Sequence, residues 1–352
     1  MGRALRLNAR MRALVLETPG ETPSMAVRER ALPSIGPSDV LVKVEAAGLC
    51  GHDVAVMRGL LRRGVRPNAV LGHEVSGRVA EAGDAVTSLR IGDAVVSALT
   101  TFCGNCDRCI SGNDYRCPNG HGVGHGIDGG FAEFVTLPAT SAVPVPNGLD
   151  LETACLLSCP TAVALRAARD VARVQPGETV LVTGAGGGLG VHSALIAAAL
   201  GARVLAVTAS PEKVARIEDL GIEEVILADD LPMSELALAL TEDRGVDIVL
   251  DSVGSAVFEQ AVRSISQDGR IMLMGEVTGS KARVSPAEIM FRDATVTGST
   301  GASVGHITDA AAMVAAGRMS PVVSERLPLE DAAEAYRLMR ERKTFGRVLL
   351  VP

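Results

Sequence analysis

The sequence predicts an α/β protein with two domains, one β-rich and one built on a doubly wound parallel sheet. Three observations predict this fold. The chain has 352 residues, which at about 150 residues per domain gives two domains. Its first half contains short Val- and Leu-rich runs separated by Gly, Pro and Asp. From about Thr179, apolar strands alternate with helix-length stretches, the pattern of a parallel sheet covered on both faces.

The elements follow from these patterns in chain order. In the first half we expect strands at residues 40–44 and 94–96. In the second half we expect strands at residues 180–183, 203–208, 225–227, 248–251 and 270–274. After residue 300 we expect a helix at 307–316, a helix at 332–338 and a strand at 347–351, which return to the first domain. The expected domain boundaries are therefore 1–157, 158–300 and 301–352, with a cysteine-rich lobe at 97–120.

Composition and charge exclude several classes of protein. There are 34 Lys and Arg against 41 Asp and Glu, a net charge of −7, and few aromatic residues, which argues against nucleic-acid binding. The longest apolar region, 189–207, is interrupted by His192, Ser193 and Arg203, so no membrane span is expected. The first ten residues have three Arg but lack the apolar stretch of a secretory signal, and we interpret them as a short extension before Met11. We therefore expect a cytoplasmic protein.

A glycine-rich turn follows the first strand of the second domain. Residues 184–190 read Gly-Ala-Gly-Gly-Gly-Leu-Gly and precede an Ala-rich, helix-forming segment. Glycine lets backbone N–H groups approach a pyrophosphate at a helix N-terminus, where a Cβ would obstruct it. A tight structural turn is the alternative, but the second strand at 203–208 favours dinucleotide binding. The expected contacts are Gly184, Gly186, Gly187, Gly188, Leu189 and Gly190.

The end of the second strand indicates which dinucleotide is bound. An acidic side chain there would accept a hydrogen bond from the ribose 2′-hydroxyl of NAD. This sequence has Thr208 at that position, followed by Ser210 and Lys213, which could hydrogen bond to or neutralise a 2′-phosphate. We therefore expect NADP, with NAD as the alternative.

Four of the seven cysteines lie within fifteen residues, at Cys103, Cys106, Cys109 and Cys117. Four thiolates at this spacing can close a tetrahedral shell around one Zn²⁺ and leave no open position. Disulfides are disfavoured, because the cysteine count is odd and no secretory signal is present. An iron–sulfur cluster is compatible with the spacing. We expect a structural zinc site.

Other ligand-type residues are scattered through the first half. Taken singly, a lone histidine or cysteine is usually a structural residue. Together, Gly48-x-Cys50-Gly-x-Asp53, Gly72-His73-Glu74, the four-cysteine lobe and the glycine turn occur in an order that resembles the zinc-dependent medium-chain alcohol dehydrogenases. The resemblance covers nearly the whole chain after Met11 and extends to segments 246–254, 269–275 and 345–348.

The resemblance implies a GroES-like catalytic domain, interrupted by a Rossmann cofactor domain, with a catalytic zinc in the cleft between them. The implied ligands are Cys50, His73 and Cys159, with the fourth position left for water or substrate. Asp53 resembles the family's acid that orients the ligand histidine, and Glu74 resembles the carboxylate that can approach the metal.

Cys155 competes with Cys159 as the third ligand. We prefer Cys159, because it is followed at 163–165 by Val-Ala-Leu, which resembles the family's Cys-x-x-x-Thr-Ala-Leu pattern. The resemblance also implies that Arg347 contacts the cofactor pyrophosphate, although a solvated arginine is the alternative. Gly275 and the turn at 297–299, which includes Ser299, are expected to approach the nicotinamide.

The implied function is that of a zinc-dependent alcohol dehydrogenase or carbonyl reductase, which moves a hydride between an alcohol and NAD(P). Many family members carry Ser or Thr two residues after the first zinc cysteine and a relay histidine three residues later. This chain has His52 and Ala55 at those positions. We hypothesise that His52 receives the substrate proton, and the alternative is that it only lines the cleft.

Two further features leave alternatives open. The glycine turn, preceded by Val-Thr, resembles the turn of quinone reductases in the same superfamily. An NADPH-dependent quinone or enoyl reductase is therefore one alternative, and a non-catalytic cofactor-binding protein is another. The segment 57–64 contains three Arg, which either meet an acidic or phosphorylated substrate or form an exposed face. The family also implies a homodimer or homotetramer acting on a small molecule.

Overall fold

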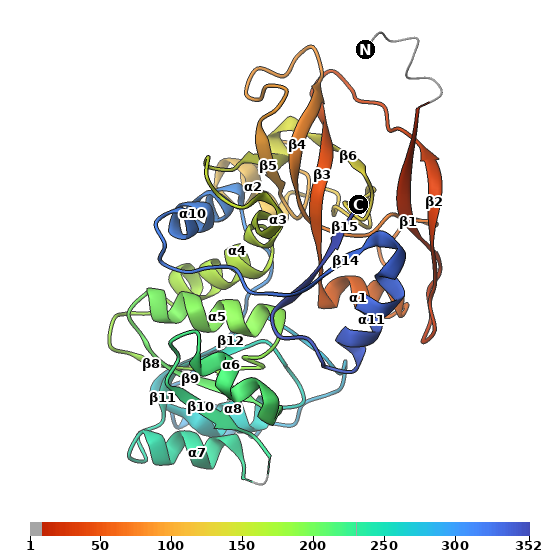
Figure 1. The fold of residues 1–352 in the computed structure, drawn as a ribbon. Coiled ribbons are helices and arrows are strands. Elements are labelled where there is room, and N and C mark those ends of the chain that lie inside the picture. The colour runs from red at the N-terminus through yellow and green to blue at the C-terminus, as the bar shows by residue number, and fades with distance from the viewer. Residues whose placement is uncertain (1–8, 230) are drawn as a thin grey trace. The chain divides into compact units, whose positions relative to one another are not determined.

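The computed structural model describes residues 9–229 and 231–352. They divide into two compact units, whose chain Figure 1 colours from red to blue. Unit 1 contains the chain up to Ala162 together with Gly301–Gly317 and Val323–Pro352, and unit 2 contains Val163–Thr300 and Arg318–Val322. Unit 1 is therefore assembled from both ends of the chain. Most of the expected extension before Met11 lies outside the described residues.

Unit 1 is organised around a mainly antiparallel sheet. Its strands follow the order β14-β15-β3-β4-β5-β7, and β6 also pairs with β3. Strand β15 pairs with β3, so the end of the chain completes a sheet that begins near the N-terminus. The bounds are β3 (Asp39–Leu49), β4 (Glu74–Ala82), β5 (Ala94–Ser97), β6 (Phe134–Pro138), β7 (Ala142–Pro144), β14 (Val323–Pro328) and β15 (Arg347–Val351). A separate antiparallel pair is formed by β1 (Arg10–Thr18) and β2 (Ser24–Ala31).

Short helices surround this sheet. The α-helices are α1 (Gly51–Met57), α2 (Asp107–Ile110), α3 (Leu151–Ala154), α10 (Val304–Ala315) and α11 (Ala332–Arg340). The 3₁₀ turns are η2 (Asp114–Arg116), η3 (Ala139–Ser141), η4 (Cys155–Leu157) and η7 (Leu329–Asp331). A core cluster joins Leu49, Met57, Leu71, Phe131 and Leu350. Burial of each such side chain stabilises the fold by about 1.5–3 kcal/mol, and the cluster fixes the end of β3 from which α1 starts.

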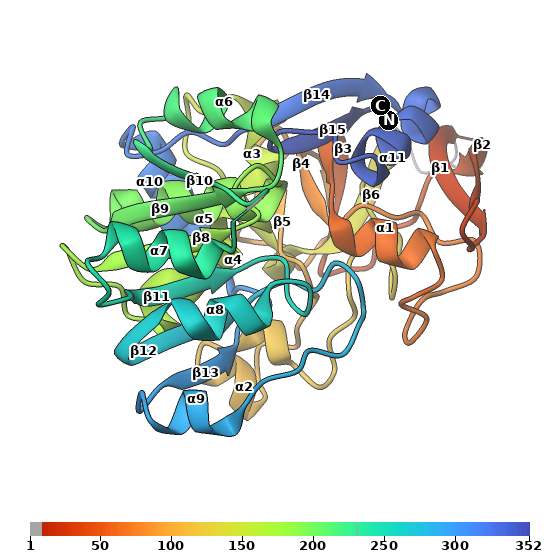
Figure 2. The ribbon, with the colours of Figure 1, turned by 90° about the horizontal axis from the view of Figure 1, so that it is seen from below.

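Unit 2 is a parallel sheet of six strands in the order β10-β9-β8-β11-β12-β13. Val180, Leu181 and Val182 of β8 are fully buried, because parallel strands are covered on both faces. Helix α5 packs against β8 and β9, and α8 packs against β11 and β12, as Figure 2 also shows for α8. The strand bounds are β8 (Thr179–Thr183), β9 (Arg203–Thr208), β10 (Glu224–Leu227), β11 (Val246–Asp251), β12 (Ile265–Leu273) and β13 (Thr295–Gly298).

The helical elements of unit 2 connect these strands. They are α5 (Gly188–Ala199), η6 (Pro211–Lys213), α6 (Val214–Glu218), α7 (Met233–Leu240), α8 (Phe258–Ser264) and α9 (Pro286–Met290). Helix α4 (Pro160–Leu165) and the π-helix η5 (Arg166–Val171) lead into the unit. The combination of a β-rich unit with a doubly wound parallel sheet is the α/β fold class that the sequence predicts.

The strand order reverses between β8 and β11. The C-terminal ends of these strands, Thr183 and Asp251, therefore meet at a topological switch point, where open α/β sheets bind ligands. The hydroxyl of Thr183 donates a hydrogen bond to Asp251 at 2.6 Å. Asp251 also accepts hydrogen bonds from the backbone of Val253 and Gly254. These bonds fix the edge of the sheet at which a dinucleotide would bind.

Strand β13 differs from the expectation for this region. We expect a turn at 297–299, whereas Thr295–Gly298 pairs with β12. A strand of only four residues that ends in glycine carries too weak a pattern to be recognised from sequence. The strand therefore contains the first two residues of the expected turn, and only Ser299 lies beyond it.

One helical run is long and apolar enough to cross a membrane. It spans Leu151–Val171, and 78% of its most apolar window is buried inside the protein. Burial of this extent is typical of a core helix. Cys159 lies within this run, between η4 and α4.

Candidate active site and metal centres

Strand pairing brings the first two predicted zinc ligands together. Cys50 follows β3 directly and is the N-cap residue of α1. In the antiparallel ladder Gly48 pairs with Glu74, the first residue of β4. Cys50 directly follows β3 and His73 directly precedes β4, so both lie next to this pair and their side chains come close together. A Cβ at Gly48 would overlap the carboxylate of Glu74, so this close approach requires glycine.

Cys159 joins this group from a third segment, between η4 and α4. One ligand atom each from Cys50, His73, Glu74 and Cys159 lies within 4.8 Å of the other three. His73 and Glu74 are buried, and both cysteines are partly exposed. Two thiols, an imidazole and a carboxylate around one point form a donor set that suits Zn²⁺. We call these four residues the catalytic-zinc cluster.

Cys155, the alternative to Cys159, lies outside this cluster. Its Sγ atom donates a hydrogen bond to the carbonyl oxygen of Glu152 at 3.1 Å. Burial raises the pKa of the Cys155 thiol well above its ordinary value. Position, rather than acidity, separates the two thiols, since the hydrogen bond to Cys50 and burial raise the pKa of Cys159 as well, but only Cys159 lies in the cluster.

Asp53 orients His73. Its Oδ1 lies 3.2 Å from Nδ1 of His73, and Oδ2 accepts a hydrogen bond from the backbone N–H of Cys50 at 2.9 Å. Burial alone would lower the pKa of His73, but the charge and hydrogen bond of Asp53 outweigh it and raise that pKa well above its ordinary value. With Nδ1 directed at the carboxylate, Nε2 remains for a metal ion.

Within the cluster, the carboxylate of Glu74 makes no hydrogen bond to the described residues. Glu74 is 0% exposed. The guanidinium of Arg347 forms an ion pair with it at 2.9 Å, but burial still raises the pKa of Glu74 to about 8. A buried carboxylate with unsatisfied oxygens needs additional positive charge. This observation fits a cation in the cluster.

The two thiols of the cluster differ in their acidity. A hydrogen bond from Cys159 lowers the pKa of Cys50 well below its ordinary value, and the charges of Arg347 and His73 act in the same direction. The same hydrogen bond and burial raise the pKa of Cys159. Metal binding would displace the proton of each thiol, since thiolates are the ligands of zinc.

His52 lies beside the cluster, and a second histidine lies against it. The ring centroids of His52 and His73 are 5.3 Å apart, and those of His52 and His125 are 5.1 Å apart. Burial of the ring, followed by the nearby charge of His73, lowers the pKa of His52. His125 was not among the residues predicted from the sequence. Its signal is the glycine-rich segment 120–126, which contains two histidines, but spacing alone does not connect it to His52.

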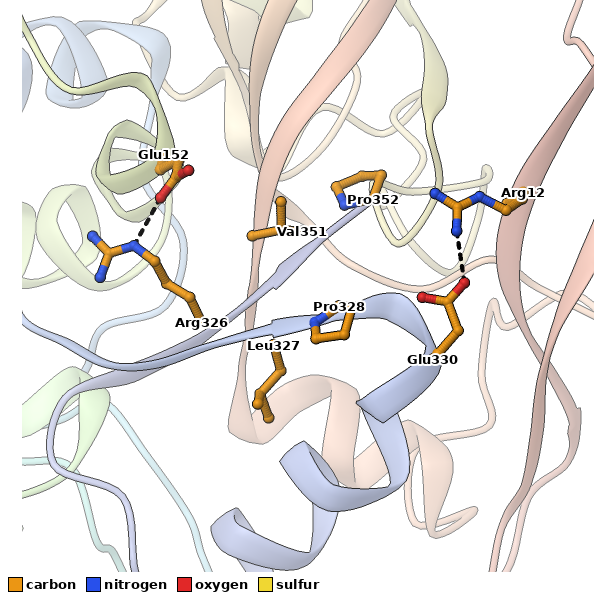
Figure 3. A pocket seen from close by; sticks show the side chains of 8 residues that line it. All are labelled: Arg12, Glu152, Arg326, Leu327, Pro328, Glu330, Val351 and Pro352. Atoms are coloured by element: carbon orange, nitrogen blue, oxygen red, sulfur yellow. Dashed lines mark hydrogen bonds and ion pairs between the residues drawn. The ribbon is translucent and has the colours of Figure 1, made fainter.

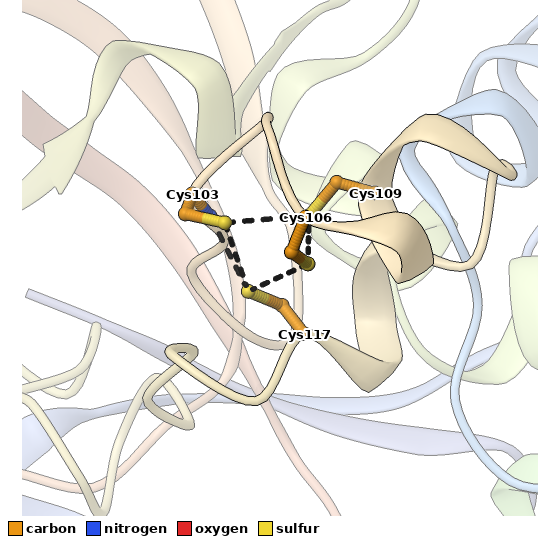
Figure 4. Close-up of side chains that lie close together, drawn as sticks. All are labelled: Cys103, Cys106, Cys109 and Cys117. Carbon is orange, nitrogen blue, oxygen red and sulfur yellow. Dashed lines mark hydrogen bonds between the residues drawn. The ribbon is translucent and has the colours of Figure 1, made fainter.

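The four cysteines of the lobe form a second cluster (Figure 4). Neighbouring Sγ atoms are 3.5 Å apart for Cys106 and Cys109, 3.6 Å for Cys103 and Cys117, 3.9 Å for Cys106 and Cys117, and 4.0 Å for Cys103 and Cys109. Four thiolates around one Zn²⁺, with Zn–S bonds of about 2.3 Å, would be about 3.8 Å apart. The sulfurs are too far apart for disulfides, and a polynuclear iron–sulfur cluster would separate them further.

The lobe is anchored to the chain that returns from unit 2. Asp114 of η2 accepts a hydrogen bond from the backbone N–H of Val304, the first residue of α10, at 3.2 Å. Gly301 lies so close to the ring of Tyr115 that a Cβ there would be 2.8 Å from it, and its φ of +74° also favours glycine. The lobe therefore holds the start of α10 in place.

The glycine turn of unit 2 has the expected strand-turn-helix form. Gly187 is the N-cap of α5, which begins at Gly188. Gly184 has a φ of +64°, and its carbonyl accepts a hydrogen bond from Gly187 at 2.8 Å. A Cβ at Gly190 would overlap the backbone of Gly184, so glycine allows the helix to pack against the turn. The exposed N–H groups of this helix end suit a pyrophosphate.

The segment from the end of β9 to the end of the 3₁₀ turn η6 contains the residues predicted to select the dinucleotide, which are Thr208, Ser210 and Lys213. Thr208 ends β9, and its hydroxyl accepts a hydrogen bond from the N–H of Ser210 at 3.2 Å. Lys213 is 7% exposed, and a Cβ at Gly186 would lie 2.5 Å from its side chain. The three residues therefore lie beside the glycine turn, and Lys213 covers Gly186.

The predicted nicotinamide contacts lie near the switch point or just beyond β13. Gly275 is hydrogen bonded to the carbonyl of Asp251, and a Cβ there would overlap the backbone of Ser252. The hydroxyl of Ser299 accepts a hydrogen bond from Arg166 at 2.9 Å. Leu189 lies in the first turn of α5. The sequence analysis did not identify Arg166, because its partner is far away in the chain.

A cavity of about 340 Å³ lies elsewhere in unit 1 (Figure 3). Both of its arginines are already paired, Arg12 with Glu330 at 2.7 Å and Arg326 with Glu152 at 2.7 Å. None of the predicted site residues lines it. The remaining lining residues are Leu327, Pro328, Val351 and Pro352.

Two family models match the chain. Residues 36–147 match the alcohol dehydrogenase GroES-like domain, and residues 188–316 match the zinc-binding dehydrogenase domain. The first match includes Cys50, His73 and all four lobe cysteines. The second includes the start of α5 and β9–β13. The matches therefore cover the four lobe cysteines, Cys50, His73 and Glu74, and five strands of the parallel sheet, while Cys159 and β8 lie between them.

Curated relatives match over almost the whole chain. An acryloyl-coenzyme A reductase of Sulfurisphaera tokodaii is 33% identical over 97% of this chain and 100% of its own length. An L-threonine 3-dehydrogenase of Rhizobium etli is 30% identical over 97% of this chain and 98% of its own length. The two relatives are named for different substrates, so their names do not assign one substrate to this chain.

Solved structures match equally well. An NAD-dependent alcohol dehydrogenase has a TM-score of 0.93 and 34% identity over 97% of this chain and 100% of its own. A zinc-binding dehydrogenase of Sinorhizobium meliloti, solved with NADP bound, has a TM-score of 0.86 and 30% identity over 98% and 100%. Zinc and NAD(P) are the cofactors of this group of enzymes, and the residues described above fit both. The chain belongs to the zinc-type medium-chain dehydrogenase/reductase family of oxidoreductases.

Proposed function

We propose that this oxidoreductase is a zinc-dependent alcohol dehydrogenase or carbonyl reductase that transfers hydride between a small alcohol and NAD(P), with NADP preferred. One observation carries the proposal. The ligand atoms of Cys50, His73, Glu74 and Cys159 lie within 4.8 Å of one another, beside an acid that orients the histidine. A reductase that makes no use of zinc would have no need of this donor set.

The proposed roles follow from the contacts. When bound, zinc supplies a Lewis acid for the substrate oxygen and the nicotinamide supplies the hydride carrier. Cys50, His73 and Cys159 would hold the ion, and Asp53 keeps Nε2 of His73 free for it. Glu74, held at 2.9 Å by Arg347, is close enough to exchange with another ligand. The lobe cysteines would hold the structural ion.

His52 is our proposal for the group that receives the substrate proton. It stands where many family members have a hydroxyl residue, and its ring lies between those of His73 and His125. We expect His52→Gln, which keeps a hydrogen-bonding group but cannot take a proton, to lower kcat by about 10²-fold. We expect His52→Ser, which restores the family's hydroxyl, to recover part of the loss. Equal, small effects of both variants would reduce His52 to a residue that lines the site.

NADP preference is the second part of the proposal. Thr208, Ser210 and Lys213 lie next to the glycine turn, and none of them is acidic. A positive Lys213 would favour a 2′-phosphate, whereas an acid at Thr208 would repel it. We expect Thr208→Asp to reverse the ratio of kcat/KM for NADP over NAD, with the KM of the alcohol unchanged.

Reduction of a carbon–carbon double bond is the second candidate. The observation that favours it is the 33% identity to an acryloyl-coenzyme A reductase, together with the absence of Ser or Thr two residues after Cys50. In this reaction the substrate double bond, conjugated to a carbonyl, takes a hydride at its β carbon and a proton at its α carbon. The carbonyl oxygen, rather than an alcohol, would then face the cluster.

The test combines metal content with substrate choice. We expect about two zinc ions per chain and activity with small alcohols or ketones that is lost on chelation and restored by zinc. Enoyl thioesters tested in parallel decide between the two reactions. Activity that survives complete removal of the metal would contradict the zinc-dependent proposal.

The proposal also includes a cellular compartment and an oligomeric state. All seven cysteines are unpaired in the structure, and a reducing cytoplasm would keep them as metal-binding thiolates. We propose that the enzyme acts there as a homodimer or homotetramer on a small-molecule substrate. Size-exclusion chromatography with light scattering measures the oligomeric state directly.

A further inference from the structure

The segment after α1 is an exposed loop with several positive charges. Residues 60–66 read Leu-Leu-Arg-Arg-Gly-Val-Arg, and we call them the arginine loop. Leu60 is 59% exposed and Leu61 is 42% exposed. Arg62, Arg63 and Arg66 are exposed as well. The loop thus concentrates three positive charges on a chain whose net charge is −7.

These arginines have no acidic partner within residues 9–229 and 231–352. The one side-chain hydrogen bond among them runs from Nε of Arg62 to the carbonyl of Gly59, at 2.8 Å. The preceding Arg58 behaves differently, because it is paired with Glu21 at 2.6 Å. Glu21 is also engaged by Arg340, so it does not neutralise the loop. Three like charges within five residues repel one another, and an anion would relieve the repulsion.

The loop is connected to the candidate active site. Its last arginine, Arg66, donates its backbone N–H to the carbonyl oxygen of His125 at 3.0 Å. The His125 ring lies 5.1 Å from that of His52, which lies 5.3 Å from that of His73. The other end of the loop continues from α1, whose N-cap is Cys50. Both ends of the arginine loop are therefore tied to elements that carry site residues.

We infer that the arginine loop binds the phosphate groups of a substrate joined to a nucleotide handle, of which coenzyme A is the form that suits the site. This inference rests on the second candidate function, the reduction of an enoyl thioester. Guanidinium groups bind phosphate through paired, charge-assisted hydrogen bonds. The exposed leucines offer an apolar surface to the base or to the arm that links it to the thioester. A small alcohol needs neither feature.

The geometry supports a long substrate rather than a free phosphate at the reacting centre. None of the loop arginines belongs to the catalytic-zinc cluster, and the contacts that connect the loop to it run from Arg66 to His125 and from the His125 ring to that of His52. An anion held there cannot itself reach the cluster, whereas a thioester on an extended arm can place its carbonyl there while its phosphates stay at the surface. Binding energy from this remote handle would then position the reacting group.

The test is a titration that does not depend on turnover. The zinc-loaded enzyme is first saturated with NADP, so that adenine nucleotides cannot enter the dinucleotide site. Coenzyme A, adenosine 3′,5′-bisphosphate, pantetheine and inorganic pyrophosphate are then titrated by calorimetry. The variant is Arg62→Ser/Arg63→Ser/Arg66→Ser. The matched control is Arg90→Ser, an exposed arginine in another loop of unit 1.

We expect coenzyme A and the bisphosphate to bind the parent enzyme and the control, and to lose at least about tenfold in affinity in the triple variant. Parent affinity should fall as salt is added, and variant affinity should fall less. Pantetheine, which has no phosphate, should bind all three proteins alike. With an enoyl thioester, the triple variant should raise KM for the coenzyme A form and leave the truncated N-acetylcysteamine form unchanged.

Two results would overturn the inference. One is coenzyme A affinity that is the same in the triple variant and the parent. The other is pyrophosphate binding as tight as that of coenzyme A, which would show a general anion surface without a nucleotide handle. The titration is independent of the proposed chemistry, since a protein that binds coenzyme A at this loop but reduces no enoyl thioester would retain the subsite and lose the second candidate function.

Discussion

The two metal clusters of this protein are built in opposite ways. The four lobe cysteines come from one stretch of fifteen residues, and Cys103 among them is exposed. The catalytic-zinc cluster takes its residues from three distant segments, and its His73 and Glu74 are buried. Four thiolates saturate an ion, whereas three ligands with a nearby carboxylate leave it a position to exchange. A closed site can therefore be formed by one short segment of sequence, whereas an open site has to be assembled from distant segments by the fold.

The electrostatic surroundings differ as well. The lobe is governed by local backbone contacts, and the N–H of Asn105 lowers the pKa of Cys103 to about 6. In the catalytic-zinc cluster, His73 is paired with Asp53 and Glu74 with Arg347, and all four side chains are buried. Loss of one group should therefore have local effects in the lobe and long-range effects in the cluster.

The largest expected effect comes from Cys50→Ser. Removal of one of three ligands should lower kcat/KM at least about 10³-fold, because the ion that polarises the substrate is lost or displaced. Zinc content should fall by about one ion per chain, as measured by plasma emission spectrometry, while the lobe ion stays. Loss of both ions together would contradict the independence of the two clusters.

The next largest effect is expected for Cys103→Ser in the lobe. An incomplete tetrahedral shell should release the structural ion and lower the free energy of unfolding by several kcal/mol, since metal binding is coupled to folding. Denaturant unfolding measures this loss. Under conditions where the variant stays folded, kcat should remain within about threefold of the parent, and a fall as large as that of Cys50→Ser would make the lobe part of the reaction site.

The buried ion pair between Glu74 and Arg347 gives a test of the long-range effects expected in the catalytic-zinc cluster. Glu74→Gln leaves a buried guanidinium without its partner, and we expect a cost of about 3–5 kcal/mol in the free energy of unfolding. The double variant Glu74→Gln/Arg347→Met removes both charges and should recover part of that cost. Thermal and denaturant unfolding of four proteins, the parent, Glu74→Gln, Arg347→Met and the double variant, gives the coupling energy. Additive effects would show that the 2.9 Å ion pair does not stabilise the fold.

The smallest effect is expected for Cys155→Ala. Its thiol is buried and bonded to the carbonyl of Glu152, outside the cluster. We expect unchanged zinc content and kcat, with a loss of at most about 1 kcal/mol in stability from one weak hydrogen bond and a small change in volume. A variant that lost zinc would identify Cys155 as a ligand in place of Cys159.

Local patterns account for the parts that sequence predicts well. Strand 203–208 is observed with the same bounds, and the strands around it agree within a few residues, because continuous apolar runs between turns specify buried parallel strands. The lobe is predictable from spacing alone. The residues that hold the open site required a resemblance to known enzymes, since Cys50, His73 and Cys159 show no relation until β3, β4 and α4 are assembled.

Non-local contacts account for what sequence does not provide. The packing of His125 on His52 depends on a glycine-rich loop reaching α1. The pairing of Arg347 with Glu74 depends on β15 joining β3, so an arginine expected either at the cofactor pyrophosphate or in solvent is the buried counter-ion of an acid. No period or spacing encodes either contact, because each follows from the tertiary fold.

A crystal of the zinc-loaded protein, with anomalous diffraction measured at the zinc edge, tests the central claim most directly. We expect two anomalous difference peaks per chain. One should lie among the four lobe sulfurs, and the other should be bound by Cys50, His73 and Cys159 with a fourth position open to exchange. A single peak in the lobe, with the sulfurs of residues 50 and 159 free of metal, would contradict the central claim.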